Sequence, residues 1–174
     1  IDPINARSTH YGGGIYLQGA ELSLQDAVVE GNSADVGGGL LSIGKLVGFD
    51  SVASRIFAQN TDFTDNAAST TGGALYVSGE SVVELSDNQF TGNQSGIGGA
   101  LYVHSATVAD TGSTFTNNRA IQTSSLGGVG GAISVSQLGA LQANGTTFSR
   151  NSAATGGAIA VRGSQDISLN NISV

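Results

Sequence analysis

Cysteine is missing from this sequence of 174 residues, and proline occurs only once. The lack of cysteine excludes a disulfide scaffold and a thiolate metal site. Charged residues make up 11% of the chain, well below the usual share of about 25% in globular proteins. Because phosphate binding needs clustered Lys and Arg, a net charge of -7 with only six basic residues argues against nucleic acid as a partner.

Long hydrophobic runs are also absent. No stretch approaches the roughly 20 apolar residues of a membrane-spanning helix, so we expect no direct membrane insertion by this segment. No signal peptide is recognisable, and the sequence starts at Ile1 without a methionine. We therefore expect a processed product or a fragment excised from a longer protein.

Glycine is abundant, and much of it belongs to a recurring tetrapeptide. Two glycines are followed by a small residue, Gly or Ala, and then by Ile or Leu. This first signature occurs at residues 12–15, 37–40, 72–75, 98–101, 130–133 and 156–159. Glycine pairs permit positive φ at a tight corner where a Cβ would clash, so each copy predicts one corner of the chain.

A second signature is an apolar residue followed three positions later by Asn. Its copies are Val29/Asn32, Phe63/Asn66, Phe90/Asn93, Phe115/Asn118 and Phe148/Asn151, with Ile4/Arg7 as a degenerate first copy and Val174 as an incomplete last one. The apolar positions follow one another at steps of 25, 34, 27, 25, 33 and 26 residues. Since the two signatures alternate strictly, the chain consists of about six repeats with a basic length of 25–27 residues.

A third element lies between the signatures, where apolar and polar residues alternate until Asp, Asn or Gly follows. Examples are Leu22/Leu24/Asp26, Val83/Leu85/Asp87 and Ile167/Leu169/Asn171. Alternation with a period of two predicts a strand, and the Asp, Asn or Gly predicts a turn. Three short strands in each repeat predict an all-β fold: a right-handed, single-stranded parallel β-helix, a solenoid of about six rungs.

Two repeats carry extra residues, near 42–55 and 119–129. We expect these insertions to be surface loops, in which Lys45–Ser54 and Ala120–Leu126 exchange amide hydrogen faster than the flanking strands. The whole chain, 1–174, is predicted to be a single β-helix domain. Because no capping segment is visible at either end, we expect it to be a segment of a longer solenoid.

Stacked repeats place equivalent side chains in columns. The chain should contain an internal Phe column and an Asn ladder at one corner, in which each amide bonds to the neighbouring rung. The predicted members are Phe63, Phe90, Phe115 and Phe148 for the column, and Asn32, Asn66, Asn93, Asn118 and Asn151 for the ladder.

The two tetrapeptides, Gly-Gly-Ala-Leu/Ile and Phe-x-x-Asn, resemble the repeats of the chlamydial polymorphic membrane proteins. The best copies run from Phe63 to Gly72, from Phe90 to Gly98 and from Phe148 to Gly156. The resemblance implies an autotransporter passenger, a β-helix exported across the outer membrane that acts in adhesion. The chain departs from that family in having no C-terminal barrel and no cysteine, and its copies at Gly12 and Gly37 are weak.

Catalysis should leave convergent polar residues, and the sequence offers none. His10 and His104 fall in different repeats, and the neighbouring acids Asp62 and Asp65 are explained by a solvated turn. The glycine-rich run 127–131 lacks the Asp of a calcium-binding nonapeptide. We therefore predict no catalytic residue, no metal site and no cofactor, and a protein that is not an enzyme.

One outward column stands out as a candidate binding surface. The position between the two inward aliphatic residues reads Tyr16, Leu41, Tyr76, Tyr102, Ser134 and Ala160, and the outward position before it reads Gly14, Gly39, Ala74, Ala100, Ala132 and Ala158. Small residues beside a Tyr stripe form a flat face that can bind a partner. The alternative is that the tyrosines only stabilise neighbouring strands. The candidate binding residues are Tyr16, Tyr76 and Tyr102.

Three functions follow, in order of preference. The first is an adhesin-like passenger segment of a secreted or cell-surface, outer membrane-associated protein, with a host receptor or a glycan as partner. The second is a structural subunit whose rods stack end to end into an extracellular filament or coat, so that the partner is another copy of the chain. The third is a carbohydrate-active β-helix enzyme, which an acidic groove with a bound metal would favour.

Overall fold

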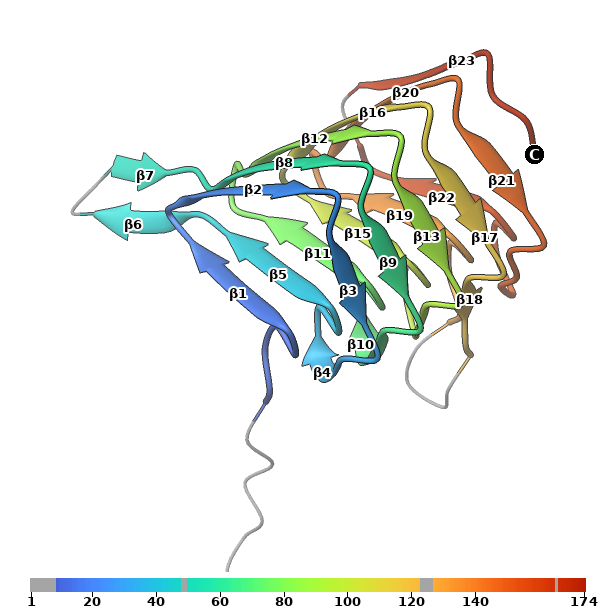
Figure 1. Cartoon of the computed structure of the whole chain (residues 1–174), viewed down its shortest axis with the longest axis horizontal. Helices are drawn as coiled ribbons and strands as arrows, with labels where there is room; N and C mark the ends of the chain where they lie inside the picture. The colour runs from blue at the N-terminus through green and yellow to red at the C-terminus, as the bar shows by residue number, and fades with distance from the viewer. Residues whose placement is uncertain (1–8, 48–49, 123–126, 165) are drawn as a thin grey trace, which may run out of the picture.

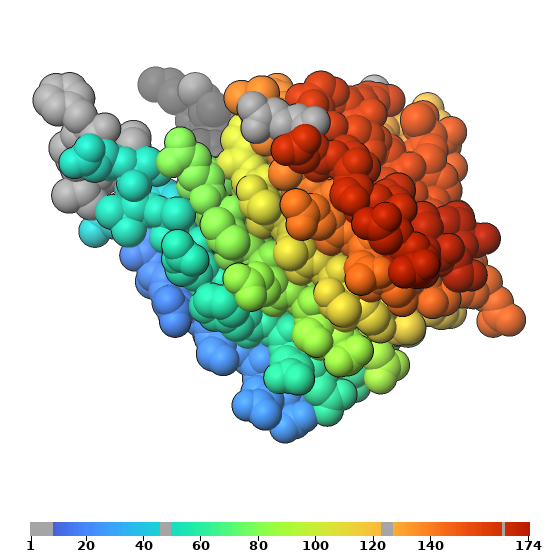
Figure 2. Space-filling view, turned by 90° about the horizontal axis from the view of Figure 1, so that it is seen from above, coloured from blue at the N-terminus to red at the C-terminus, as the bar shows by residue number. Residues whose placement is uncertain are grey.

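The computed structural model describes residues 9–47, 50–122, 127–164 and 166–174, and these residues form strands, turns and bridges but no helix. Figure 1 shows one coil of chain whose rungs, the complete turns of the coil, lie side by side. In the space-filling view the rungs appear as adjacent bands running from blue to red (Figure 2). The fold is an all-β parallel β-helix, as predicted. Crossovers between parallel strands are right-handed in about 98% of cases, and we retain that handedness as a prediction.

Four parallel sheets run along the rod, and the chain visits them in the same order in each rung. The first sheet contains β1 (Ile15–Gln18), β5 (Leu40–Ile43), β11 (Leu75–Ser78), β15 (Leu101–His104), β19 (Ile133–Ser136) and β22 (Ile159–Arg162). The second contains β2 (Glu21–Gln25), β8 (Arg55–Gln59), β12 (Val82–Ser86), β16 (Thr107–Thr111), β20 (Ala140–Asn144) and β23 (Ile167–Asn170).

The third and fourth sheets are made of shorter strands. The third contains β3 (Val28–Glu30), β9 (Asp62–Thr64), β13 (Gln89–Thr91), β17 (Thr114–Thr116) and β21 (Thr147–Ser149). The fourth contains β4 (Ser33–Val36), β10 (Ala67–Thr71), β14 (Gln94–Ser95) and β18 (Arg119–Ala120). The sequence predicts three strands in a rung, so the fourth sheet is a correction. Its strands shrink to two residues in β14 and β18, which is too short for alternation to be recognised.

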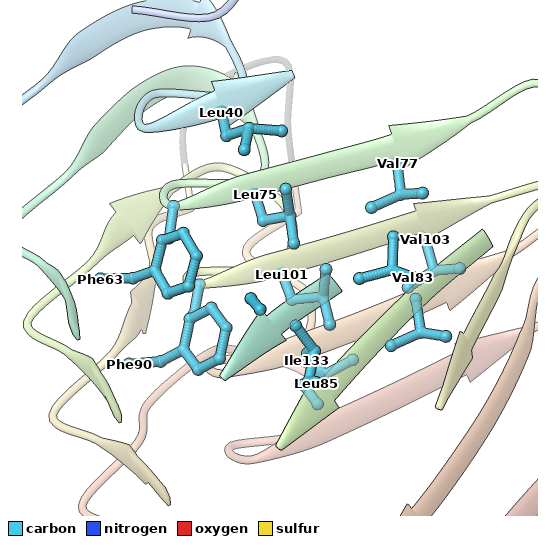
Figure 3. Packing of buried hydrophobic residues seen from close by; sticks show 14 of the residues in the cluster. Leu40, Phe63, Leu75, Val77, Val83, Leu85, Phe90, Leu101, Val103 and Ile133 are labelled. Carbon is cyan, nitrogen blue, oxygen red and sulfur yellow. The ribbon is translucent and has the colours of Figure 1, made fainter. Parts of the chain in front are cut away.

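The core is a stack of apolar layers inside the coil, because strand side chains alternate between the two faces of each sheet. In β11, Leu75 and Val77 are buried, and in the facing β12 Val83 and Leu85 are buried while Glu84 is exposed. Figure 3 shows these side chains interdigitating with those of the neighbouring rungs. The register aligns equivalent positions, as with Leu75 opposite Leu101 in β15, so each rung adds one layer to the same core.

The corners depend on residues that accept positive φ. Between the second and third sheets, Asp26, Asn60 and Asp87 adopt φ of 49°, 48° and 53°, a conformation that short polar side chains tolerate better than others. The glycine pairs turn the chain from the fourth sheet into the first. There the rungs approach closely: a Cβ on Gly99 would lie 2.0 Å from the carbonyl oxygen of Gly131, so no larger residue fits.

The first insertion is not the predicted loop. Strands β6 (Lys45–Val47) and β7 (Asp50–Val52) pair as an antiparallel hairpin, which projects beside β1 and β2 (Figure 1). Apolar and polar residues alternate only weakly in this insertion. Hydrogen bonds between its two short segments nevertheless stabilise them as a pair of strands.

The second insertion leaves the rod after β18. Its ends are held by an antiparallel bridge between Gln122 and Gly127, and Val129 then rejoins the rod by a parallel bridge to Ile97. The predicted loop Ala120–Leu126 therefore contains a strand residue and a bridge residue at its start, and its part from 123 to 126 lies outside the described residues. Nowhere in the described residues is there a helix long and apolar enough to cross a membrane.

Candidate functional site: an aromatic groove beside internal ladders

The four predicted phenylalanines form one stacked column inside the rod. Neighbouring rings lie with centroids 4.7 Å apart for Phe63 and Phe90, 4.5 Å for Phe90 and Phe115, and 5.2 Å for Phe115 and Phe148. The first two pairs are parallel within 4°. Val29 continues the column opposite Phe63 and is also buried. The column fills the core beneath the third sheet and offers no surface to a partner.

The asparagines form a ladder at the corner between the third and fourth sheets. Asn93 donates its backbone N–H and its Nδ2 to Oδ1 of Asn118, each at 3.0 Å, and its Nδ2 also donates to the carbonyl of Phe63 at 2.8 Å. Asn66 repeats this pattern toward Asn93, and Asn118 repeats it toward Asn151. Asn32 lies at the N-terminal end of the ladder and donates to Asn66. Each amide from Asn66 onward thus satisfies a backbone N–H and a backbone carbonyl of the preceding rung.

The small residues next to the Tyr column face this ladder, which corrects the prediction that they face outward. Ala74, Ala100 and Ala132 are fully buried core residues. A Cβ on Gly39 would lie 3.0 Å from Cγ of Asn66. The chain is still turning the corner here, so the strict alternation of a strand has not begun, and only a small side chain fits against the stacked amides.

A second internal ladder escaped the sequence reasoning. Thr61, Asn88, Ser113 and Thr146 follow the positive-φ turn between the second and third sheets, and all four are buried. The backbone N–H of Thr61 donates to Oδ1 of Asn88 at 2.9 Å, and that of Asn88 to Oγ of Ser113 at 3.1 Å. Four small polar residues at the same position in successive repeats were the pattern that could have revealed it.

Asp110 brings a carboxyl group into the core next to this second ladder. Thr146 donates its hydroxyl to Oδ2 of Asp110, whereas Oδ1 has no hydrogen-bond partner among the described residues. Burial raises the pKa of this carboxyl above its usual value, although hydrogen bonds from Ser113 and Thr146 work in the opposite direction. The equivalent residues Leu85 and Ala143 are apolar, so Asp110 is a local exception to the core pattern.

The predicted tyrosines line a groove on the outer face of the first sheet. Its volume is about 480 Å³, and its walls and floor are formed by Tyr11, Tyr16, Val36, Leu41, Ile43, Thr71, Tyr76, Tyr102 and His104. The rings of Tyr76 and Tyr102 lie 5.5 Å apart at an angle of 40°, and Tyr16 is 50% exposed. Leu41, which the sequence predicts to be an exposed member of the column, is only 1% exposed and lies at the floor.

Tyr11 joins the other tyrosines although sequence reasoning omitted it. It precedes the first glycine pair and pairs with Val36, which pairs in turn with Thr71, so these three residues form one edge of the groove. The repeat could have pointed to Tyr11, because this residue occupies the position before a glycine pair. The four tyrosines that line this groove are all the tyrosines of the chain.

A polar cluster lies at the C-terminal side of the groove. The hydroxyl of Tyr102 is 2.7 Å from Oγ of Ser136 and 3.4 Å from Nδ1 of His104, and the last two atoms are 3.3 Å apart. These three groups can donate and accept hydrogen bonds at the edge of an otherwise aromatic and aliphatic surface. Burial raises the pKa of the Tyr76 hydroxyl above its ordinary value.

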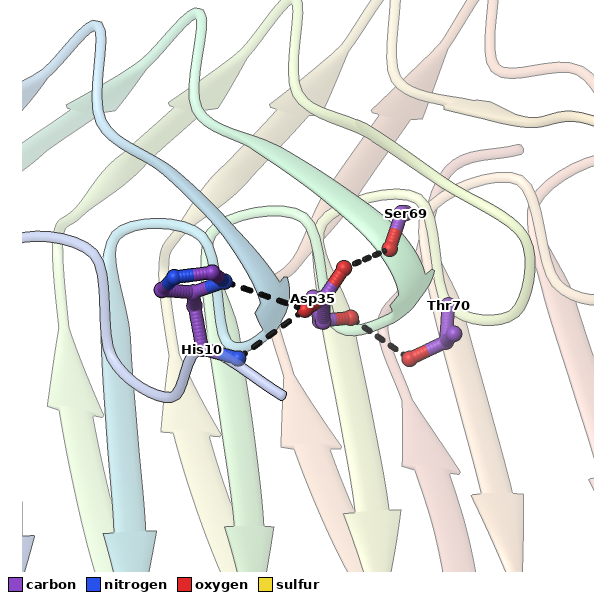
Figure 4. A network of polar contacts seen from close by, with 4 residues as sticks. All are labelled: His10, Asp35, Ser69 and Thr70. Atoms are coloured by element: carbon purple, nitrogen blue, oxygen red, sulfur yellow. Dashed lines mark hydrogen bonds and ion pairs between the residues drawn. The ribbon is translucent and has the colours of Figure 1, made fainter. Parts of the chain in front are cut away.

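The two histidines belong to separate sites. His10 lies near Asp35, with its Nδ1 3.4 Å from Oδ2, and Ser69 donates to the other carboxylate oxygen at 2.5 Å (Figure 4). Ser69 contacts the carboxylate of Asp35 and not the imidazole of His10. In a Ser-His-Asp triad the histidine lies between the serine and the aspartate, so these three groups are not arranged as a triad. The hydrogen bonds from the Ser69 hydroxyl and the backbone N–H of His10 lower the pKa of the Asp35 carboxyl. Through these bonds Asp35 links the first rung to its neighbours. Among the described residues no three His, Asp or Glu side chains gather as a metal site would require.

Stacked Phe-x-x-Asn and Gly-Gly-Ala copies on a parallel β-helix define the chain as a repeat solenoid. The sequence model of the Chlamydia polymorphic membrane protein repeat matches residues 60–78, 112–136 and 145–162, so these three segments carry that repeat. The polymorphic membrane proteins are a family of outer-membrane and surface proteins. The copy from Phe90 to Gly98 lies outside the three matched segments. No curated protein and no solved structure matches the chain significantly.

Proposed function

We propose that this chain is an adhesin-like passenger segment of an extracellular, outer membrane-associated protein, and that it binds a host receptor or glycan through the tyrosine groove. The observation that supports the proposal is that all four tyrosines, two of them about half exposed, line one groove. Exposed aromatic rings gathered on one surface are typical of binding sites.

The fold itself does not require these tyrosines. Ser134 and Ala160 occupy the same column as Tyr102 in the following two rungs, and their strands pair in the same register. The core of each rung is already filled by the inward residues, such as Leu101 and Val103. Because packing can do without the rings, a role at the surface accounts for them better than strand stacking alone.

Attachment of the displayed chain to cells tests this proposal. Beads coated with the chain should adhere to cultured epithelial cells, and the double variant Tyr76→Ser with Tyr102→Ser should reduce adhesion at least about tenfold, as expected for loss of aromatic anchors. Phe57→Ser is the matched control, since it removes a partly buried ring from the outer face of the second sheet. Equal adhesion by the double variant and the control would overturn the proposal.

A second candidate function is end-to-end assembly into a filament or coat. Val161 in β22 and Leu169 in β23 occupy inward positions but are 43% and 39% exposed, whereas Val135 in the preceding rung is fully buried. In the described residues these strands also lie at one edge of the first and second sheets, and an edge strand is a template for another strand. Another copy of the chain could cover this surface.

A further inference from the structure

The groove is unusually free of charge for this chain. The molecule carries 13 acidic and 6 basic residues, yet none of the nine described residues that line the groove is Asp, Glu, Lys or Arg. A charged ligand would lose its hydration there without gaining a counter-ion, which is unfavourable. The groove therefore suits an uncharged ligand.

The size of the groove points to a small ligand rather than a protein surface. Its volume of about 480 Å³ lies within the range of about 300–1,000 Å³ that is usual for small-molecule sites. A stable protein–protein interface involves about 20–30 residues on each side, more than twice the nine that line this groove.

The chemistry of the lining is both apolar and hydroxyl-rich. The rings of Tyr76 and Tyr102 lie in adjacent rungs with their centroids 5.5 Å apart, and Leu41 and Ile43 add aliphatic surface to the lining. Tyrosine combines an apolar body with a polar tip, and the Tyr102–Ser136–His104 cluster adds donors and acceptors at one end. A sugar ring offers the complement: apolar C–H faces for stacking and hydroxyl groups around its edge.

From these three features we infer that the ligand of the groove is a neutral oligosaccharide. Sugar rings stack on Tyr76 and Tyr102, and their hydroxyl groups exchange hydrogen bonds with Tyr102, His104 and Ser136. This inference rests on the proposed binding function of the same groove and specifies the chemical class of its ligand.

The chain contains a built-in reporter for this test. It has no tryptophan, and its four tyrosines all line the groove, so its intrinsic tyrosine emission reports on that surface. The probes are the glycans released from the same epithelial cells, separated by anion exchange into neutral and acidic pools. A lactose-based neutral tetrasaccharide and its sialylated form are a defined pair, in which the second carries one additional sugar residue with a carboxylate.

We expect a saturable change in tyrosine emission with the neutral pool and the neutral tetrasaccharide, and binding at least about tenfold weaker for the sialylated form, whose carboxylate would be desolvated without a counter-ion. Calorimetry on variants should follow the same chemistry. Tyr76→Phe keeps the ring and should bind nearly normally, whereas Tyr76→Ser should lose binding. Ser136→Ala should weaken binding about 2- to 10-fold, as expected for one neutral hydrogen bond, and Phe57→Ser should have no effect.

Two results would separate failure of this inference from failure of the proposed function. If adhesion depends on Tyr76 and Tyr102 but neutral glycans do not bind, or acidic glycans bind better, the inference is wrong and the binding function stands. If adhesion does not depend on these tyrosines, the proposed function fails first.

Discussion

At the scale of single residues, the role of a side chain is set by its column. Phe90 is buried between two parallel rings, while Phe57 lies on the outer face of the second sheet and is only partly buried. Both are aromatic residues in short strands of a parallel sheet, and it is their positions in the repeat that separate them. The difference in their environments makes their expected contributions to stability very different.

Phe90→Ala should lower the free energy of unfolding by about 3–5 kcal/mol, because it leaves a cavity between Phe63 and Phe115 that the rigid rungs cannot close. Urea denaturation followed by circular dichroism measures the change. Phe57→Ala is the control and should cost clearly less. Similar midpoints for the two variants would contradict an internal role for the Phe column.

Asp110 predicts a dependence of stability on pH. Its pKa is raised in the folded protein, so folding favours the protonated carboxyl. The stabilisation is complete below the unfolded pKa of about 3.8 and is lost as the pH rises through the folded value. Asp110→Asn cannot ionise, and its stability relative to the native chain should therefore increase between pH 3.5 and pH 7. Urea midpoints at several pH values measure this, and a difference that is constant with pH would contradict it.

At the scale of elements, the strands repeat from rung to rung within the molecule, whereas the connections between them vary in length. The connection from the first to the second sheet takes Gly79, Glu80 and Ser81 in one rung, whereas the preceding rung uses 44–54 and includes the β6–β7 hairpin. Ser54 and Ser81 both donate their hydroxyls to the last carbonyl of the first-sheet strand of their rung. The acceptors are the carbonyls of Ile43 in β5 and Ser78 in β11. The two connections therefore join the rod in the same way.

Replacing residues 44–54 by Gly-Glu-Ser should accordingly leave the β-helix intact. The hairpin pairs within itself, and the short connection already bridges the same two sheets one rung later. We expect an unchanged circular dichroism spectrum and a free energy of unfolding within about 1 kcal/mol of the native chain, as for a surface change. Loss of cooperative unfolding would mean that the hairpin is part of the stable core.

At the scale of the whole molecule, the last rung exposes side chains whose equivalents in the preceding rung, Val135 and Ala143, are buried. Val161 and Leu169 should make the 174-residue chain associate as its concentration rises, through contacts between rod ends. Light scattering measures the association, and Val161→Asp with Leu169→Asp should suppress it by placing charges on the edge. Asp substitutions at Ser23 and Gln142, on the outer face of the second sheet, are the control. A chain that stays monomeric at every concentration would argue against end-to-end assembly.

The repeating signatures determined the fold because each rung repeats the same local choices. Glycine pairs, positive-φ Asp or Asn turns and alternating apolar residues are local requirements, and in register they leave one arrangement, a parallel β-helix with the inward residues in its core. The Phe and Asn columns could be named from the sequence for the same reason: equal positions in equal rungs must lie above one another.

Only the tertiary structure decided which surface residues come together. Tyr11 belongs to the groove because it pairs with Val36 of the next rung, and Leu41 lies at the floor although its column faces outward. Ala74 turns inward because the corner has not yet become a strand. Periodicity states which residues are equivalent, but corner geometry and the neighbours across rungs set which way each side chain faces and what it meets.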